Sequence, residues 1–213
     1  MININTNYGS LFASNSANKS QRMMDTAMER LSSGLRINSA KDDAAGQGIA
    51  TRLTAEIQGL AVASRNASDA QSMLDTAEGA LQETHTVLLR MRELAVQGAN
   101  GVLTDKDLDA LDAEFQQLEA EIDRIAANTN WGGKDLLTSL AVTFQVGTAN
   151  TSDDRISFTM PDTDSSTLGI TAAVAVTSTA GAQGAITILD SAISKVSEER
   201  GRLGAQTLFS NQP

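Results

Sequence analysis

Apolar residues recur along most of this chain at alternating intervals of three and four, the spacing of an α-helix that packs along a seam. The clearest seam comprises Leu108, Leu111, Phe115, Leu118, Ile122 and Ile125. A second comprises Leu74, Ala77, Leu81, Thr84, Leu88, Met91 and Ala95, and an upstream stripe comprises Ile49, Leu53, Ile57 and Leu60. A third comprises Ile186, Leu189, Ile193, Val196 and Leu203, and a short stripe near the start comprises Met24, Met28, Leu31 and Leu35.

Turn residues divide these stripes into separate helices. Residues 97–101 contain two glycines and an asparagine, which end the first long helix. Thr104 and Asp107 resemble a capping box, with Asp in place of Glu, that opens the next helix. The run Asn-Trp-Gly-Gly at 130–133 ends that helix in turn. The pattern predicts helices over about 44–97, 105–128 and 185–204.

After residue 139 the hydrophobic period changes from the helical spacing to two. Leu140, Val142 and Phe144 alternate with polar or small residues, and so do Ile156 and Phe158. Residues 147–154 separate the two runs, so the pattern predicts a β-hairpin. The stretch 171–185 is rich in Ala, Thr, Ser and Gly, which indicates a weakly ordered connector or a short pair of strands.

The long helix sets the architecture. At 1.5 Å per residue it would extend about 80 Å, and a helix of that length needs partners alongside it to be stable in water. The sequence therefore predicts a mainly α fold, an elongated antiparallel coiled-coil rod of long helices with a small β-hairpin. The expected parts are an N-terminal helical segment (1–43), the rod (44–140 and 185–206), the hairpin with a short outward region (141–184) and an atypical tail (207–213).

Composition narrows the range of functions. The formal net charge is −10, which argues against nucleic acid as a partner because phosphates would be repelled. Cysteine is absent, so disulfides and thiolate metal sites are excluded. The first ten residues have neither the basic start nor the apolar run of a secretory signal, and no segment is long enough to cross a membrane. We therefore expect neither nucleic acid nor a membrane as a partner.

Candidate catalytic chemistry is sparse. His85 is the single histidine, and beside the second seam it is better read as a partly solvated helical residue than as a ligand. Residues 162–173 resemble a calcium loop but lack its sixth-position Gly and twelfth-position Glu, and residues 46–51 match only part of a dinucleotide fingerprint. Asp42 and Asp43 are better explained by the positive end of a helix dipole. We expect no enzyme activity, cofactor or metal.

One run of residues carries a specific family resemblance. Residues 31–50, Leu-Ser-Ser-Gly-Leu-Arg-Ile-Asn-Ser-Ala-Lys-Asp-Asp-Ala-Ala-Gly-Gln-Gly-Ile-Ala, resemble the N-terminal signature of bacterial flagellins. Weaker matches extend the resemblance to about residue 205, with Trp131 where the family more often has Phe. The signature positions, to which the resemblance assigns a role in assembly, are Leu31, Ser32, Gly34, Arg36, Ile37, Asn38, Ala40, Asp42, Asp43 and Ala44.

The resemblance implies a structural protein of the bacterial flagellum. Flagellins leave the cell unfolded through the flagellar type III export apparatus, polymerise outside beneath the filament cap, and contribute to motility. The implied partners are therefore other flagellin subunits, the export apparatus and the cap, and the implied location is extracellular. The alternative is a hook–filament junction protein, a distant relative of flagellin.

The resemblance stops short at the C-terminal side. In flagellins the two chain ends pair as helices that line the filament core, whereas this sequence ends at Pro213. A natural truncation, a shifted reading frame and an edited sequence would all give this ending. We expect segment 1–43 to lack its partner helix and to be mobile. We also expect the chain to be defective in polymerisation and in binding the export chaperone.

The resemblance also implies two kinds of surface site. Many flagellins are sensed by an animal Toll-like receptor, and the matching positions here are Arg90, Leu94 and Glu114. Arg90 and Leu94 lie on one helical face because they are four residues apart. In some flagellins the outward region carries O-linked sugar, and the matching positions here are Thr177, Ser178 and Thr179.

Overall fold

The computed structural model of the chain describes residues 7–171 and 174–210. Parts of the predicted N-terminal segment, connector and tail, namely residues 1–6, 172–173 and 211–213, lie outside the described residues. The helices are α1 (Tyr8–Ser33), α2 (Ala44–Gly98), α3 (Asp105–Asn128), α4 (Ser165–Leu168) and α5 (Thr179–Ser210). The strands are β1 (Asn130–Trp131), β2 (Lys134–Asp135), β3 (Ala141–Gln145) and β4 (Arg155–Thr159). This confirms the mainly α fold of long helices with a small antiparallel hairpin.

The chain divides into two compact units, Met1–Gln58 and Gly59–Pro213, so the division falls inside α2. In the first unit α1 starts at Asn7, whose side-chain oxygen accepts a 3.2 Å hydrogen bond from the Ser10 N–H. It ends at Gly34, which adopts φ +71° and donates its N–H to the Arg30 carbonyl. A left-handed glycine is a common helix stop because it lacks a Cβ that would clash.

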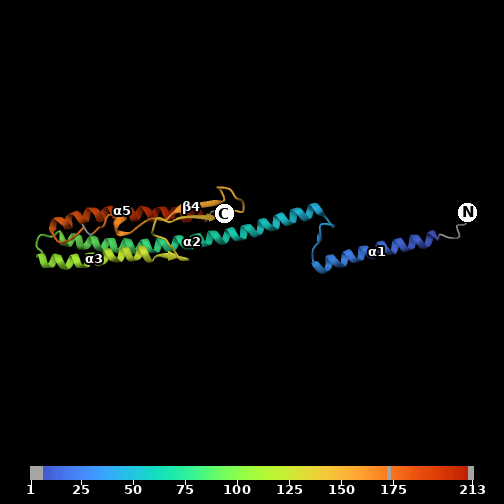
Figure 1. Cartoon of the computed structure of the whole chain (residues 1–213), viewed down its shortest axis with the longest axis horizontal. Coiled ribbons are helices and arrows are strands. Elements are labelled where there is room, and N and C mark those ends of the chain that lie inside the picture. Colours follow the sequence, from blue (N-terminus) through green and yellow to red (C-terminus); the bar gives the residue numbers. More distant parts are fainter. Residues whose placement is uncertain (1–6, 172–173, 211–213) are drawn as a thin grey trace. The chain divides into compact units, whose positions relative to one another are not determined.

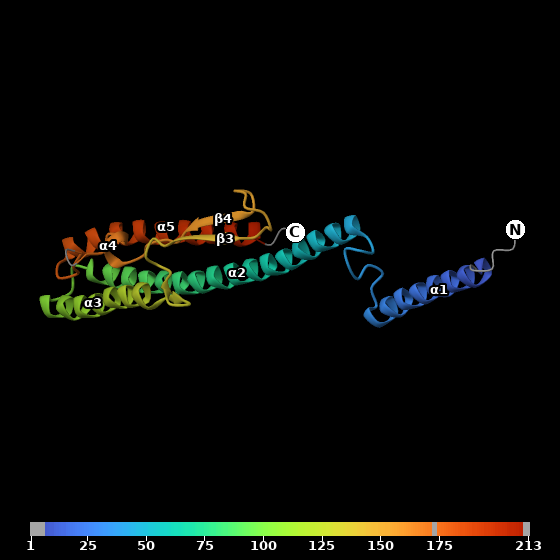
Figure 2. The same cartoon turned by 45° about the vertical axis from the view of Figure 1, so that its right-hand side comes forward.

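The second unit is built on three long helices. Its part of α2 lies beside α3 and α5, both of which run antiparallel to it (Figures 1 and 2). Two ion pairs fix the register of α5 on α2, since Arg92 bonds Asp190 at 2.6 Å while Arg200 bonds Glu78 at 2.8 Å. Later residues of α2 thus meet earlier residues of α5, as antiparallel packing requires.

The seams of α2 and α3 form the core as predicted. All seven residues of the α2 seam are buried, and Leu81, Leu88 and Ala95 are completely inaccessible. In α3 alternate seam positions, Phe115 and Ile122 among them, are fully buried while the others are half-buried. Burying a Leu, Ile or Phe side chain stabilises the fold by about 1.5–3 kcal/mol, so these seams supply its main support.

The seam of α5 differs from the prediction. Ile186 and Ile193 are half-buried, whereas the alanines that precede them, Ala185 and Ala192, are buried. The buried positions keep the three-four spacing as far as Val196, and three of the six are alanines: Ala182, Ala185, Leu189, Ala192, Val196 and Leu203. The prediction placed the larger isoleucines in the seam and was wrong at these positions, because helices that approach closely favour small side chains at the centre of the contact.

The α5 helix also begins earlier than predicted. Residues 179–184 were expected to belong to the connector, but they form the first turns of α5. A Cβ at Gly181 would lie 2.7 Å from the Ala175 carbonyl oxygen, so this glycine permits a close backbone approach instead of breaking the helix. Residues 207–210 of the predicted tail are likewise helical, because α5 continues to Ser210.

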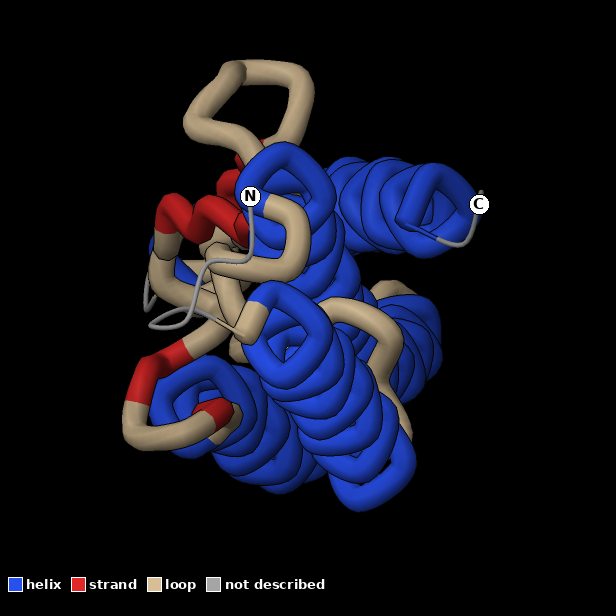
Figure 3. The backbone as a smooth tube through the Cα atoms, turned by 90° about the vertical axis from the view of Figure 1, so that its right-hand side faces the viewer, coloured by secondary structure: helices blue, strands red, loops and turns tan. Residues whose placement is uncertain are grey.

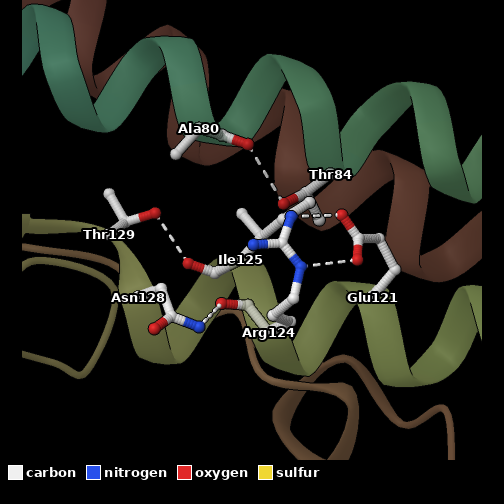
Figure 4. A network of polar contacts seen from close by, with 7 residues as sticks. All are labelled: Ala80, Thr84, Glu121, Arg124, Ile125, Asn128 and Thr129. Atoms are coloured by element: carbon white, nitrogen blue, oxygen red, sulfur yellow. Dashed lines mark hydrogen bonds and ion pairs between the residues drawn. The ribbon is translucent and has the colours of Figure 1, made fainter.

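Hydrogen bonds cap both ends of α3. Asp107 accepts from the Thr104 N–H at 3.0 Å, the acidic half of the predicted capping box. At the other end the Thr129 hydroxyl donates to the Ile125 carbonyl at 2.6 Å (Figure 4). Figure 4 also shows Thr84 of the α2 seam, whose hydroxyl donates a hydrogen bond to the Ala80 carbonyl of the same helix. A buried polar residue in this seam therefore costs little.

The hairpin β3–β4 has the predicted strands and turn. Val142 pairs with Phe158 and Phe144 with Ile156, and these four form its half-buried face. In Figures 1 and 2 the hairpin lies along α5, and its strands are among the red segments of Figure 3. The Asn66 side chain of α2 donates to the carbonyl of Gln145 at 3.0 Å, which ties the hairpin to the helices.

Two aspartates of α3 hold the segment that returns from the hairpin to α5. Buried Asp112 accepts from the Val176 N–H at 2.7 Å, and Asp123 accepts from the Ser165 N–H at 2.8 Å. Between them, desolvation by burial raises the pKa of Glu119, and the charges of Asp123 and Asp112 raise it further. Neither role was predicted from the sequence, because each bond joins residues that are far apart along the chain.

Two glycines of α2 should respond to alanine in opposite ways. A Cβ at Gly98 would overlap Val176 Cγ1 and lie 3.3 Å from Ala182 Cβ, so Gly98→Ala should destabilise the chain by about 1–3 kcal/mol through overpacking. Gly79 is exposed with open space around its Cβ position, so Gly79→Ala should stabilise it by up to about 1 kcal/mol through helix propensity. Urea denaturation followed by circular dichroism measures both. Equal effects of the two changes would contradict this account of Gly98.

Candidate functional site

The first unit presents an uncovered apolar surface. No residue of α1 is buried, and Leu31 at its end is 80% exposed. The stripe continues on the part of α2 before residue 59, where Ile57 is 67% exposed. The exposed large side chains of this unit are Tyr8, Leu11, Phe12, Met23, Met24, Met28, Leu31, Leu35, Ile49, Leu53 and Ile57. Such a surface is typical of a helix that packs against a partner.

Basic residues accompany part of this stripe. Lys19, Arg22 and Arg30 share one side of α1 with Met23 and Leu31. Their long stems add apolar area while their charged ends remain in solvent. This side of α1 thus combines methionine and leucine with positive charge, in contrast to the acidic chain as a whole.

The loop between α1 and α2 is organised by Asp42. One oxygen of this carboxylate accepts from the N–H groups of Asn38 and Ser39, each at 3.2 Å, and from the Ser39 hydroxyl. These bonds lower the pKa of Asp42 because they stabilise the ionised carboxylate, and the bond from the Asn38 N–H has the largest effect. The Asn38 side chain in turn donates to Glu29 of α1 at 2.9 Å. The bonds therefore connect the loop to the helix before it.

Asp43 begins the second helix. Its Oδ1 accepts a 2.8 Å bond from the Gly46 N–H, which is N-cap geometry and agrees with the expected interaction at a helix N-terminus. Asp42 was assigned the same role, but it belongs to the loop. A Cβ at Gly46 would overlap the Asp43 carboxylate and lie 2.8 Å from Ile37 Cδ1, so the cap leaves room only for glycine.

The predicted signature residues therefore form one helix–loop–helix. Leu31 and Ser32 lie in the last turn of α1, Gly34 stops it, and Ala44 is the first residue of α2. Arg36 and Ala40 lie in the loop, where both are exposed. The signature thus forms the corner between two helices that expose their apolar stripes.

The predicted receptor-facing residues occupy the other unit. Arg90 of α2 donates to Glu114 of α3 through Nη2 at 2.8 Å and Nε at 3.1 Å, and to Glu93 at 3.0 Å. These bonds raise the pKa of Arg90 because they stabilise the charged guanidinium, and the bond to Glu114 has the largest effect. All three side chains are largely exposed, so the pair adds little to stability and is accessible to a partner.

Leu94 departs from that prediction. Its side chain is only 1% exposed and belongs to the core cluster. Position 94 follows Arg90 by one helical turn, but at this end of α2 the buried face widens to include Met91, Leu94 and Ala95 together. Leu94 can therefore support the surface around Arg90 from beneath, and it does not present its side chain there.

Comparison with known proteins identifies the family. The sequence profile of the bacterial flagellin N-terminal helical region matches residues 4–141, which contain the helix–loop–helix and the α2–α3 pair. The chain belongs to the bacterial flagellin family. A flagellin of Salmonella muenchen is 52% identical over 168 residues, which cover 78% of this chain and 33% of that protein. Flagellin 1 of Proteus mirabilis is 47% identical over 169 residues, 78% of this chain and 46% of that protein.

Solved structures agree with the assignment. The crystal structure of Bacillus cereus flagellin shares 34% identity and a TM-score of 0.61, over 70% of this chain and 85% of that one. A putative flagellar hook-associated protein from Vibrio parahaemolyticus has a TM-score of 0.66 over 81% of this chain and 91% of that one, but at 17% identity it shares the fold alone. This flagellin spans about a third of the length of the Salmonella relatives it matches.

Other predicted sites of this flagellin lie in varied surroundings. Thr177 and Ser178 are exposed in the segment before α5, whereas Thr179 is half-buried at its first position. The Ser178 hydroxyl accepts from the Gly181 N–H at 3.1 Å. His85 is half-buried, and within the described residues its Nδ1 atom has no hydrogen-bond partner.

The described residues lack two kinds of feature. They contain no group of three or more acidic or histidine side chains arranged to hold a metal ion. Over the same residues, no helix of this flagellin combines the length and the apolar character needed to span a bilayer. Two surfaces of the described residues are candidate sites, the exposed stripe with its signature corner and the surface around Arg90 and Glu114.

Proposed function

We propose that this flagellin is a structural subunit of the bacterial flagellar filament and contributes to motility. The observation that supports it is the exposed apolar stripe of the first unit, built on the signature corner at 31–50. Apolar side chains of such a stripe stabilise a structure only when another helix covers them, and polymerisation of subunits would provide that helix. Its partners would be other flagellin subunits, with the export apparatus and the filament cap acting before and during assembly.

The proposed location is the extracellular flagellum, reached through type III export. The Asp42 and Asp43 bonds are local, so the corner can form as soon as the chain is outside. No step of this function requires catalysis. Flagellins are a structural family, and we propose no enzyme activity for this chain.

The alternative, a hook–filament junction protein, shares the fold, as the likeness to the Vibrio parahaemolyticus protein illustrates. Identity to flagellins of 47% and above, over more than three-quarters of this chain, favours the filament subunit. The two roles differ in abundance, since a filament contains many more subunits than a junction. Quantifying this protein in purified flagella therefore discriminates between them.

The chain of 213 residues should not form stable filaments alone. In flagellins a helix from the other end of the chain pairs with the counterpart of α1, whereas no described residue of this chain covers α1, so its stripe would pack incompletely in a filament of this chain alone. Acidic surfaces also repel one another at low salt. The purified chain is mixed with fragments of flagellin filaments as seeds, or with a precipitant at high salt, and inspected by electron microscopy and sedimentation. Salmonella muenchen flagellin on the same seeds is the positive control. Smooth filaments of the chain alone would overturn this prediction and leave the family assignment intact.

Arg90→Ala and Glu114→Ala should each weaken signalling through a flagellin-sensing Toll-like receptor several-fold without loss of helicity, because both side chains are exposed. Arg92→Ala is the matched control, since Arg92 pairs with Asp190 instead. Leu94→Ala should act differently and lower stability by about 2–5 kcal/mol through a core cavity. A reporter-cell assay beside thermal denaturation separates the two effects. Unchanged potency of both surface variants would remove the proposed receptor site.

We also propose that the segment before α5 carries O-linked sugar. Of the candidate positions, Thr177 and Ser178 are exposed and Thr179 is less accessible, so attachment should favour the first two. The intact mass of the protein from its native host, followed by peptide mapping, tests this. A mass equal to that of the unmodified chain would rule it out.

A further inference from the structure

The turn between α2 and α3 contains an unusual pair of residues. Asn100–Gly101 is the only Asn-Gly dipeptide in the sequence, and both residues are exposed. Backbone bonds hold the turn on either side, from the Asn100 N–H to the Gln97 carbonyl at 3.1 Å and from the Leu103 N–H to the Asn100 carbonyl at 3.4 Å. Among the described residues, neither the Asn100 side-chain amide nor the Gly101 N–H has a hydrogen-bond partner.

Other asparagines of the described chain are restrained. Asn15 and Asn18 lie within α1, where the following N–H belongs to the helix, and Asn130 lies in β1. The remaining side chains are hydrogen-bonded: Asn7 to Ser10, Asn38 to Glu29, Asn66 to Gln145, Asn128 to Arg124 and Asn150 to Arg155. Asn100 alone among these combines a free side chain, a free following N–H and a following glycine.

We propose that Asn100 is a site of spontaneous deamidation in this flagellin. The Gly101 nitrogen loses its proton and attacks Cγ of Asn100, forming an N–Cγ bond. The Cγ–Nδ2 bond then breaks, and ammonia leaves with the proton. Water opens the five-membered succinimide at either carbonyl, giving aspartate or isoaspartate. The net change is amide plus water to acid plus ammonia, so no oxidant, reductant or cofactor is needed.

The surroundings of Gly101 favour the attack. No heavy atom lies within 4 Å of the place that a Cβ would take, and its φ lies outside the left-handed region. Glycine gives the backbone the freedom to bring its nitrogen towards Cγ. An alanine would restrict this motion, yet it would fit the native turn without a clash or strain. Gly101→Ala is therefore a control that changes the chemistry and preserves the fold.

The product would alter the turn in two ways. Each conversion adds a negative charge beside the cap at Thr104 and Asp107, in a chain that is already acidic. The isoaspartate form also lengthens the backbone by one methylene between two packed helices. Isoaspartyl groups are substrates for carboxyl methyltransferases that use S-adenosylmethionine, so aged protein would become such a substrate at this position.

The test is to incubate the purified chain at 37 °C and at mildly acidic and mildly basic pH, roughly one unit either side of neutrality, and to map peptides by mass spectrometry. Conversion should concentrate at Asn100 and rise several-fold with pH, because the attacking nitrogen must be deprotonated. Gly101→Ala should slow it several-fold with unchanged circular dichroism, and Asn100→Gln should abolish it. Methyl transfer by an isoaspartyl methyltransferase should follow the same order. Equal rates in Gly101→Ala and the parent, or conversion mainly at other asparagines, would overturn the proposal.

Discussion

The second unit depends on the burial of one face of α2 between α3 and α5. Few aromatic residues are available, since they make up 3% of the chain, so the contact is built from aliphatic side chains and alanine in regular spacing. Each leucine of the seam contributes about 1.5–3 kcal/mol, and the regular spacing lets these contributions add along the helix. The hairpin and the return segment pack apolar side chains, Met160, Ile170 and Val176 among them, into the same core, and polar bonds such as those of Asn66 and Asp112 fix where they lie on the helices. Without the packed helices these bonds would have no fixed partners.

The same type of stripe has opposite outcomes in the two units. Leu81 and Leu88 are completely buried, whereas Leu53 and Ile57, on the same helix, stay exposed. Helical periodicity shows which face of a helix seeks a partner, but it does not show whether that partner lies in the same chain. In the first unit the described residues leave the stripe uncovered, and the partner that we propose for it is another subunit.

Sequence reasoning worked where one side chain decides the outcome locally. The ends of α2 and α3, the Thr104–Asp107 cap and the two strands of the hairpin all follow from spacing and turn chemistry. It failed where three-dimensional proximity decides. Ala185 and Ala192 are buried in place of the neighbouring isoleucines because α5 approaches its neighbours closely. Leu94 is buried because the core widens at that end of α2. The roles of Gly46 and Asp112 were missed for the same reason, since each depends on an atom outside its own helix.

The order of the helices along the chain has a consequence for how the second unit folds. The α2–α3 contact joins neighbours across a short turn, so it requires little loop-closure entropy and can form early. The contact of α5 with α2 is far less local, as the Arg200–Glu78 pair shows, and it must enclose the hairpin and the return segment. We therefore expect α5 to dock last in refolding, with the two aspartates of α3 already presented on a formed helix.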